Sequence, residues 1–550
     1  MDTLIVASLA FPLVLAALVA LPSCRPAALS LAPWAPLPAL ALAARAEPSL
    51  DLPGVLLGIT LGLDATGRLF LAFTALVWLI AGVFARGWLG NDARPVRYWV
   101  FWLLTLTGNL GVCLALDAVS FYLAFALMSF AAYGLIVHPG SAEARRAGRV
   151  YLTMAVLGET ALVMGLILAV QGAGAHAFTA LAAAPANAAA AWLLIVGFGI
   201  KLGVPLLHMW LPLAHPVAPV PASAVLSGVM LKAGLLGLLR GLPLGTQALP
   251  EAGSTLVLAG VAAMFLGAAA GLMQRNPKVL LAYSSVSQMG YLSLGVGAGL
   301  LAPAAWPLLL PALGLYALHH ALAKSTLFLG VGLIQAHGVQ RVRLVLLGLP
   351  ALALAGAPLT SGALAKDALK AALDGLHGPG LALATHLLPL AALATALLMA
   401  RLLWLAWRLP TPNDTGAAPR GIQAPWVLAM VASATLPWGL VTHAARADAF
   451  ELATLVAATW PLLAAAGLGM AAVALRVRAP ELPPGDLLHP LARLFRRPHA
   501  TSPHGRFPAV TVRLPRMPGL PTASSAIPKS VRAGALWLAL LILLTLTLAR

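Results

Sequence analysis

Long apolar runs recur from one end of this 550-residue sequence to the other, and they leave few folds open to it. Most of the runs reach about 20 residues, the length at which a helix crosses the hydrocarbon core of a membrane. Charged residues make up 9% of the chain, whereas a soluble domain contains about 25%. The sequence therefore predicts an all-α polytopic membrane protein.

Four lysines lie inside these apolar runs, namely Lys201, Lys232, Lys324 and Lys366. A charged lysine at the centre of a bilayer costs about 3 kcal/mol on insertion scales, so it is rare unless it faces a wet or protein-lined interior. Four in one chain predict a path for protons or other cations. The alternative is that some of them extend to the headgroup layer, which best fits Lys366 because it lies near a predicted helix end.

About sixteen apolar spans can be counted along the chain. They are centred near residues 12, 36, 75, 107, 128, 160, 199, 230, 264, 291, 320, 358, 396, 433, 464 and 541. Lysine and arginine gather in the loops that follow odd-numbered spans, with Arg45 and Arg240 as exceptions. The positive-inside rule makes these loops cytoplasmic and the N-terminus external, with residues 3–21 as a retained helix. The formal net charge of +18 then reports orientation in a bacterial inner membrane rather than nucleic-acid binding.

Two of the spans contain helix-breaking residues close to a buried lysine. In the seventh span Lys201 is followed by Gly203 and Pro205, and in the twelfth Pro358 precedes Lys366. Broken helices free backbone groups, which is tolerated at membrane depth only against protein or a water-lined cavity. The breaks lie five spans apart, as an inverted five-helix repeat with sites at its breaks would require.

Several motifs resemble those of the antiporter-like proton-channel subunits. The longest and most specific is GFGIKLGVPLLHMWLPLAHPVAPVPASAVLSGVMLKAG at residues 197–234. SSVSQMGY (284–291), ALHHALAKSTLFLGVG (317–332) and SGALAKDAL (361–369) follow in the order of the family, and LGLDATGRLFLAF (61–73) is similar to its early membrane segment. That family includes the large membrane subunits of respiratory complex I, the Mrp-type sodium/proton antiporters and membrane subunits of the hydrogenase-4 type.

The resemblance implies two inverted five-helix bundles, each with a half-channel, and a row of ionisable residues along the middle of the membrane. The proton-relay residues expected from it are Lys201 on the first broken helix, Lys232 as the bridge, His319, His320 and Lys324 as links in the second half, and Lys366 on the second broken helix. Secondary positions are His208 and His215, at the cytoplasm-side loop of the family, and Asp367. A lysine that is desolvated in a bundle can gain and lose a proton near neutral pH, and histidine titrates there already.

The chain departs from the family at one position that matters for this relay. The family carries a glutamate on the fifth span in a pattern like W-E-L-M-S, and Ala126 stands at the aligned position here. Glu159, on the sixth span, is the deep carboxylate nearby. It can take over the missing role as partner of Lys201, or the first half-channel is silent and the subunit partly structural. The third alternative is that Glu159 stays protonated and hydrogen-bonded locally.

The expected organisation has six segments. N-terminal membrane helices occupy residues 1–96, the first repeat 97–242, the second repeat 254–376, the C-terminal helices 383–476, a basic proline-rich cytoplasmic loop 477–533 and the last helix 534–550. The loop is interpreted as solvated, with at most one short amphipathic helix, because its prolines forbid a long one. It is too short and too proline-rich to be the long lateral helix of the largest complex I subunit of this type, which favours an orphan, Mrp-like or hydrogenase-like relative.

Weaker signals predict structural roles. Asp64 and Asp117 lie near span ends and are interpreted as cap or interface residues, His138 as a surface residue beside a loop, and Trp210 as part of an interfacial aromatic belt. No nucleotide-binding, P-loop, clustered-cysteine or serine-triad motif occurs in a fitting context. No cofactor, metal site or catalytic centre is therefore expected on this chain.

Two functions of different classes fit these observations. The first is an ion-translocating subunit of a multi-subunit membrane complex, moving protons or exchanging sodium for protons. The second is a non-conducting membrane scaffold that docks a peripheral enzyme: a hydrogenase, a dehydrogenase or an inorganic-carbon uptake partner. The fold of the family covers both. Membership of an enzyme complex, such as a quinone oxidoreductase or hydrogenase, stays open at this point.

Overall fold

The computed structural model describes residues 2–45, 48–90, 92–410, 418–477 and 480–485. Contacts divide the chain into a larger unit, residues 1–52 and 59–486, and a smaller one, residues 53–58 and 487–550. Of the smaller unit only 53–58 are described, and they form turns. The expected cytoplasmic loop beyond residue 485 and the expected last helix, 534–550, lie outside the described residues.

The chain begins with short and long helices and one hairpin. They are α1 (Asp2–Ala20), α2 (Arg25–Leu31), the 3-10 helix η1 (Ala32–Trp34), α3 (Leu37–Ala43), and strands β1 (Ser49–Leu52) and β2 (Ile59–Gly62). The strands pair antiparallel, with Ser49 opposite Gly62 and Leu52 opposite Ile59. The second apolar span is thus divided around its prolines, because proline lacks the amide that a continuing helix needs. The hairpin is a small departure from the expected all-α fold.

Helices make up the rest of the larger unit. Up to the middle of the chain they are α4 (Ala65–Trp88), α5 (Pro95–Leu114), α6 (Ala118–Ile136), α7 (Ala142–Ala173), α8 (Phe178–Ala183), α9 (Ala188–Leu202), α10 (Trp210–Val217), α11 (Val220–Val225), the π-helical turn η2 (Leu226–Met230) and α12 (Leu231–Gly241). There follow α13 (Pro250–Leu272), α14 (Pro277–Leu301), η3 (Pro303–Ala305), α15 (Trp306–His337), α16 (Arg341–Ala355), α17 (Ser361–Leu373), α18 (Leu381–Trp407), α19 (Arg420–Leu440), α20 (His443–Asp448) and α21 (Leu452–Ala474).

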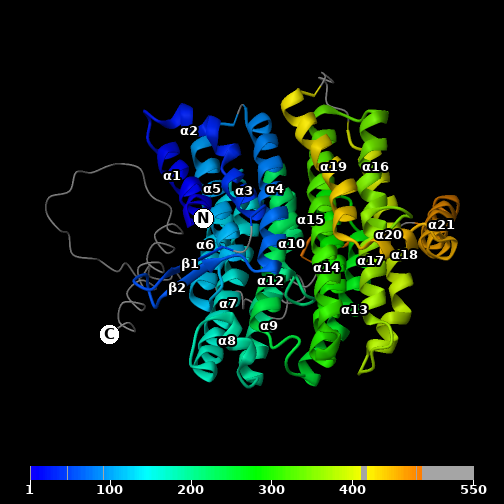
Figure 1. Ribbon diagram of the computed structural model, residues 1–550. Coiled ribbons are helices and arrows are strands. Elements are labelled where there is room, and N and C mark those ends of the chain that lie inside the picture. Colours follow the sequence, from blue (N-terminus) through cyan, green and yellow to red (C-terminus); the bar gives the residue numbers. More distant parts are fainter. Residues whose placement is uncertain (1, 46–47, 91, 411–417, 478–479, 486–550) are drawn as a thin grey trace, which may run out of the picture. The chain divides into compact units, whose positions relative to one another are not determined.

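Most of the long helices of this unit run roughly parallel to one another (Figure 1). Among the described residues, ten helices are long and apolar enough to cross a membrane by length and composition. The expectation of a helical multi-pass membrane protein is therefore confirmed, while the count of sixteen spans stays a prediction. The core between the helices is apolar and includes large buried aromatic side chains such as Trp78, Trp102 and Tyr98.

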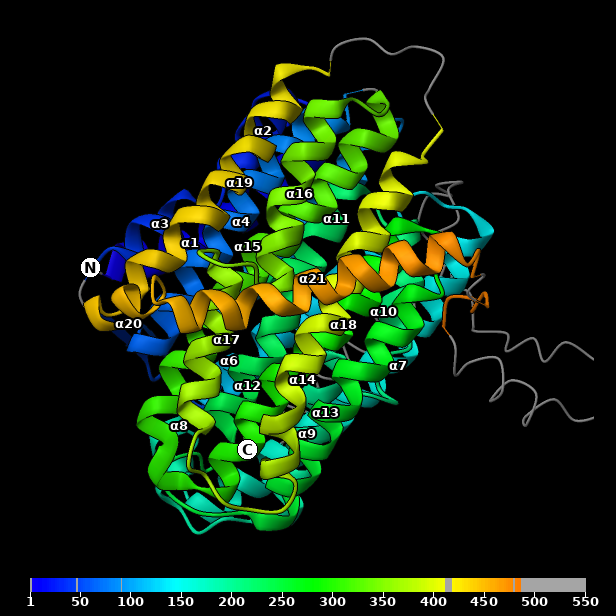
Figure 2. The same ribbon diagram turned by 90° about the vertical axis from the view of Figure 1, so that its right-hand side faces the viewer.

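Helix α21 differs from its neighbours in direction. It meets the length and composition of a membrane span, yet in Figure 2 it runs across α18 instead of alongside it. It packs against α18, and side chains such as Leu463 and Met470 are more than half exposed. The segment around residue 464 is thus a lateral apolar helix in this structure, although the sequence predicts an ordinary fifteenth span.

Two aspartates near helix starts cap those helices, as their positions predict. The Asp64 carboxylate accepts the amide of Gly67 at the start of α4. The Asp117 carboxylate accepts the amides of Val119 and Ser120 at the start of α6. Side-chain oxygens at such positions satisfy amides that have no partner within the helix.

Arg240, an exception to the pattern of loop charges, is buried inside the protein. Its guanidinium donates to the carbonyls of Val112 at 3.1 Å, Cys113 at 3.2 Å and Ala115, all at the C-terminal end of α5. It also pairs with Asp64 at 3.0 Å. A cation at a helix C-terminus satisfies free carbonyls and the negative end of the helix dipole. Arg240 is therefore a structural capping group and carries no signal about membrane orientation.

The two breaks expected from the sequence lie between α9 and α10 and between α16 and α17, and they share one local conformation. Residues 203–206 read GVPL and residues 356–359 read GAPL. Gly203 and Gly356 are left-handed, with φ of 83° and 87°, and each ends the preceding helix. Leu206 and Leu359, three residues later, also have positive φ, at 70° and 58°. A positive φ is uncommon for a leucine and costs energy, so finding it at both breaks indicates two related turns.

The close packing across the second break depends on Gly362. A Cβ atom at this position would lie 1.7 Å from the carbonyl oxygen of Ala353 and 3.1 Å from Cε1 of His319. Overpacking a well-packed core costs about 1–3 kcal/mol, and we expect Gly362→Ala to lower the free energy of unfolding by at least this amount. The measurement is the thermal stability of the purified full-length chain. Gly348→Ala on α16 is the matched control, because nothing lies within 4 Å of its added carbon. Equal stability of the two variants would contradict the packing of α16 on α17.

Candidate ion-relay site

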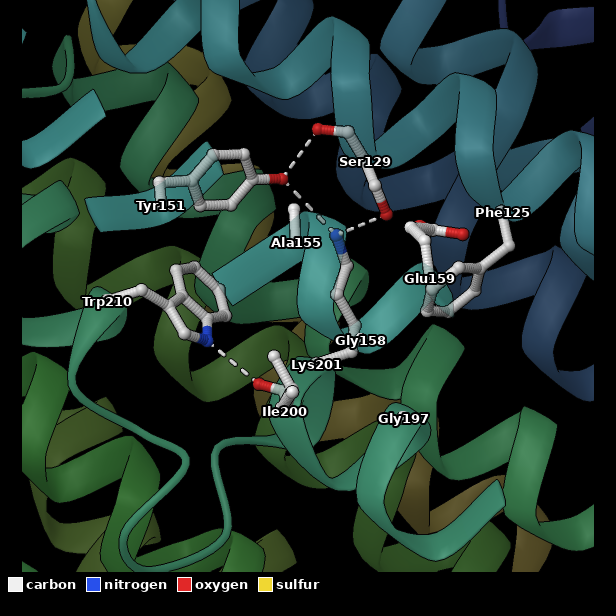
Figure 3. A pocket seen from close by; sticks show the side chains of 10 residues that line it. All are labelled: Phe125, Ser129, Tyr151, Ala155, Gly158, Glu159, Gly197, Ile200, Lys201 and Trp210. Atoms are coloured by element: carbon white, nitrogen blue, oxygen red, sulfur yellow. Dashed lines mark hydrogen bonds between the residues drawn. The ribbon is translucent and has the colours of Figure 1, made fainter. Parts of the chain in front are cut away.

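Lys201 lies at the last turn of α9 and points into a small cavity (Figure 3). About 20 Å³ of the cavity is open to water-sized molecules, which is room for one water. The ammonium donates to the Ser129 hydroxyl at 3.1 Å and to the Tyr151 hydroxyl at 3.4 Å. The rings of Phe125 and Tyr151 lie 5.6 and 5.8 Å from it. Lys201 is 6% exposed, so it is held by neutral groups inside the protein.

Helical spacing explains which side chains face this cavity. Tyr151, Ala155, Gly158 and Glu159 of α7 follow the i, i+4, i+7, i+8 pattern of a single helix face. Helix α9 approaches this face closely because a Cβ atom at Gly197 would lie 2.9 Å from the carbonyl oxygen of Gly158. Because Gly158 and Gly197 have no side chains, the turn of α7 that carries Glu159 can pack directly against the turn of α9 that carries Lys201.

Glu159 faces the same cavity as Lys201, as expected for a partner of that lysine. The side chain is 5% exposed, and its charge interacts with that of Lys201. Within the described structure no ion pair within 4 Å joins the two groups, and neither carboxyl oxygen makes a hydrogen bond. The geometry thus brings the two residues to one cavity without direct contact. Their partnership as a relay step stays a prediction.

Lys232 lies just after the π-helical turn η2, and its ammonium binds a backbone carbonyl of this turn. Its ammonium donates to the carbonyl of Ser227 at 3.0 Å and is hydrogen-bonded to Nδ1 of His320 on α15. A π-helical turn interrupts the regular bonding of an α-helix and occurs often at functional sites. Lys232 is 1% exposed and is therefore kept away from lipid and solvent.

The other predicted residues of the second half surround α15 and the second break. Lys324 is fully buried and donates to the carbonyl of Leu281 at 2.8 Å. His319 is bonded through Nδ1 to the Ser361 hydroxyl at 2.8 Å, at the start of α17. The charges of Lys366 and Lys232 both act on His319. These contacts form one continuous group of buried ionisable side chains.

Side chains that follow each break reach back to the end of the preceding half-helix. Lys366 on α17 donates to the carbonyls of Leu354 at 3.2 Å and Ala355 at 2.7 Å, at the C-terminus of α16. Trp210 on α10 donates from Nε1 to the carbonyl of Ile200 at 2.8 Å, near the end of α9 (Figure 3). Both contacts satisfy carbonyls that the break leaves without a helical partner. The ammonium of the half-buried Lys366 is therefore bound by protein carbonyls.

Of the secondary positions, His215 lies within the second group, whereas Asp367 lies at its exposed edge, where its charge acts on Lys366. His215 is fully buried on α10 and stacks on Phe328 of α15, with 4.6 Å between ring centroids. The charges of Lys324 and Lys278 act on it. His208 lies in the first break and contacts the ring of Tyr283 at 6.1 Å. Asp367 is exposed on α17.

Three residues near the relay were not predicted as site residues. Ser129 and Tyr151 were missed because hydroxyls within an apolar run are common, and only the packing of α6 and α7 brings them to Lys201. Lys278 was counted among loop charges, but α14 begins at Pro277 and Lys278 is buried, donating to the carbonyl of Ala218 at 2.5 Å. The signal for Lys278 was its place directly before the apolar run of α14.

Two interpretations of single residues are wrong. Trp210 is 2% exposed, so it is a core residue and not part of an interfacial belt. His138 is also buried, and its Nε2 lies 3.0 Å from Asp92. Burial raises the pKa of Asp92, but the hydrogen bond of His138 and the amide of Arg94 outweigh this effect and hold the pKa below its usual value. Burial lowers the pKa of His138, so at pH 7 a neutral imidazole bonds a carboxylate.

The relay residues therefore form two groups. Lys201 and Glu159 make up the first; Lys232, His320, His319, Lys324, Lys366 and His215 make up the second. Helix α12, which carries Lys232 of the second group, packs against α9, and a Cβ atom at Gly234 would lie 3.2 Å from Cβ of Lys201. No hydrogen bond or ion pair between described residues joins Lys201 or Glu159 to Lys232. The fold and these buried ionisable side chains define a helical, multi-pass membrane protein with polar groups inside its helix bundle.

Comparisons with known proteins agree with this class. A family model described as "NADH:quinone oxidoreductase/Mrp antiporter, TM" matches residues 115–385. The chain is 30% identical over 290 residues to hydrogenase-4 component B of Escherichia coli, which covers 50% of this chain and 43% of that protein. It is 34% identical over 216 residues to NAD(P)H-quinone oxidoreductase chain 4 2 of Microcystis aeruginosa, covering 37% and 38%. The matches thus span less than half the length of each relative.

A solved structure has the same fold. The Mrp complex from Dietzia sp. DQ12-45-1b contains a chain that superposes with a TM-score of 0.71 at 22% sequence identity, over 90% of this chain and 59% of that one. The motifs, the matched family model and this fold agree. The chain belongs to the NADH:quinone oxidoreductase/Mrp antiporter family of membrane subunits.

Proposed function

We propose that this chain is a proton-translocating membrane subunit of a multi-subunit complex, in which protons pass between buried lysine, histidine and glutamate side chains. The observation that carries the proposal is the burial of Lys201, Lys232 and Lys324 among helices, each with acceptors supplied by the protein. Such lysines are costly to keep in an apolar environment unless they serve a function. In a variant of this proposal the subunit exchanges sodium for protons, and the same path carries both ions.

The architecture proposed with this function is a pair of inverted five-helix repeats, residues 97–242 and 254–376, each interrupted by one broken helix. Support comes from the shared GxPL turns, with a left-handed glycine and a positive-φ leucine in both. The two repeats are not equivalent chemically. Lys201 precedes its turn by two residues, whereas Lys366 follows its turn by seven, so the lysines lie on opposite sides of the two breaks.

The proposed partners are other membrane subunits, in a bacterial inner membrane, with the N-terminus outside. Support comes from the names of the relatives, which are a component of hydrogenase-4 and a chain of a quinone oxidoreductase. The alternative function, a non-conducting scaffold that docks a peripheral enzyme, is favoured by one observation. The first group has Ala126 where the family has glutamate, and within the described part of the chain no hydrogen bond joins this group to the second.

A test of conduction uses Glu159. In inverted vesicles that hold the full-length chain in its native complex, we expect Glu159→Gln to lower the rate of proton uptake by about 10²-fold, as for loss of a positioned proton acceptor. Glu143→Gln, an exposed carboxylate on the same helix, is the matched control and keeps the rate. Adding Ala126→Glu to Glu159→Gln restores uptake if the two positions serve one role. A full rate in Glu159→Gln alone favours the scaffold.

A further inference from the structure

The Ser129 hydroxyl has a bonding pattern that makes it more than an anchor for Lys201. Its oxygen accepts a hydrogen bond from the Lys201 ammonium at 3.1 Å. No hydrogen bond between described residues takes up its own proton, but the hydroxyl interacts with the Glu159 carboxyl, so that carboxyl is the acceptor to which the proton is available. Ser129 lies one helical turn beyond Ala126 on α6, at i+3, and therefore on the same side of that helix as the missing glutamate.

The Tyr151 hydroxyl can donate in only one direction, and this fixes its hydrogen bonds with Ser129 and Lys201. Its hydroxyl donates to the backbone carbonyl of Ser129 at 2.7 Å, so its only proton is used and it offers lone pairs to Lys201. The ring is held by an edge contact with Trp210, at 5.3 Å between centroids. Tyr151 thus ties α7 to the Ser129 turn of α6 and accepts from the ammonium without being able to pass a proton to Ser129.

The carboxyl of Glu159 is the acceptor that faces the remaining side of the cavity. It interacts with both Ser129 and Lys201, but neither of its oxygens has a hydrogen-bond partner in the described structure. A buried carboxyl without a partner is costly. The cavity between these groups has about 20 Å³ open to water, enough for one molecule with polar neighbours on several sides.

We propose that Ser129 is the bridging hydroxyl between Lys201 and Glu159, acting through one water, and that Tyr151 is the residue that positions it. A proton leaves the Lys201 ammonium for the Ser129 oxygen as the Ser129 proton moves to the water and a water proton moves to the Glu159 carboxylate. One N–H bond breaks and one O–H bond of the carboxylic acid forms, so the ammonium and the carboxylate become a neutral amine and a neutral acid. The hydroxyl and the water are regenerated. This bridge replaces the carboxylate absent at Ala126, and it rests on the proposed proton translocation.

The test compares Ser129→Ala with Ser129→Thr in the full-length chain within its native complex, in inverted vesicles with a pH-sensitive dye. We expect Ser129→Ala to lower proton uptake by about 10²-fold, and Ser129→Thr, which keeps a hydroxyl, to recover most of the rate. Tyr151→Phe keeps the ring contacts and loses only the hydroxyl, so we expect a smaller loss of rate together with a shifted pH profile of uptake. Thr107→Val is the control, because the Thr107 hydroxyl bonds only the carbonyl of Leu103 in its own helix, at 2.9 Å.

The possible outcomes distinguish failure of the Ser129 bridge from failure of the proposed proton translocation. The bridge is wrong if Ser129→Ala keeps the wild-type rate and pH profile of proton uptake. It is also wrong if Ser129→Ala and Ser129→Thr lose the same fraction of the rate at equal protein level, because Ser129 would then act by packing. If Glu159→Gln also leaves uptake unchanged, proton translocation through the first group fails as a whole. If Glu159→Gln abolishes uptake and Ser129→Ala does not, only the bridge is wrong.

Discussion

Replacing Lys201 with methionine abolishes proton uptake by vesicles while the protein still assembles; this is the largest functional effect that we expect. Methionine fills nearly the same volume as the lysine stem but cannot carry a proton. The Ser129 and Tyr151 hydroxyls lose a donor but remain neutral groups, and Tyr151 keeps its bond to the Ser129 carbonyl. A buried ammonium is itself costly, and the Glu159 carboxyl, whose charge interacts with that of Lys201, can take up a proton once that charge is gone, so we expect the stability of the fold to change little.

The measurement is the initial rate of proton uptake in inverted vesicles, with the amount of assembled complex determined on the same membranes. Arg146→Met on α7 serves as the control for loss of a positive charge, because Arg146 is exposed on that helix. Uptake at the wild-type rate in Lys201→Met would falsify the assignment of Lys201 to the proton path. Loss of the complex from the membrane would instead make Lys201 a structural residue.

Much of the fold follows from local sequence signals. Glycine and proline predict both breaks, because Gly203 and Gly356 end their helices in the left-handed conformation. Aspartate before an apolar run predicts the caps at Asp64 and Asp117. By contrast, the direction of α21 is not contained in its length or hydropathy. A segment that is apolar on all sides can lie across neighbouring helices as well as alongside them.

The sequence predicts those site residues whose charge conflicts with an apolar surrounding, but it does not predict the neutral side chains that bind them. Lys201 and Lys324 stand out because charged groups are rare inside apolar runs. Ser129 and Tyr151 lie 72 and 50 residues from Lys201 in sequence, respectively, so only tertiary packing shows their role. Arg240 is an exception to the pattern of loop charges for the same reason, since its partners at the end of α5 are more than 120 residues away.

Lys366 combines two roles that substitutions can separate. Its ammonium caps the C-terminus of α16 by donating to the carbonyls of Leu354 and Ala355, where a positive charge also faces the negative end of the helix dipole. Lys366→Met removes both bonds, and hydrogen bonds to charged groups contribute about 1.5–3 kcal/mol each. We therefore expect Lys366→Met to lower the thermal stability of the full-length chain and to abolish proton uptake.

Lys366→Arg separates the cap from the relay. Arginine keeps a positive charge and several donors for the α16 carbonyls, but its guanidinium cannot release a proton in a protein. We expect this variant to retain most of the stability and to lose proton uptake as fully as Lys366→Met. Lys370→Arg, on the exposed side of the same helix, controls for the substitution itself and keeps both properties. If Lys366→Arg transports protons at the wild-type rate, Lys366 is a helix cap alone, and the path through the second group does not pass through the second broken helix.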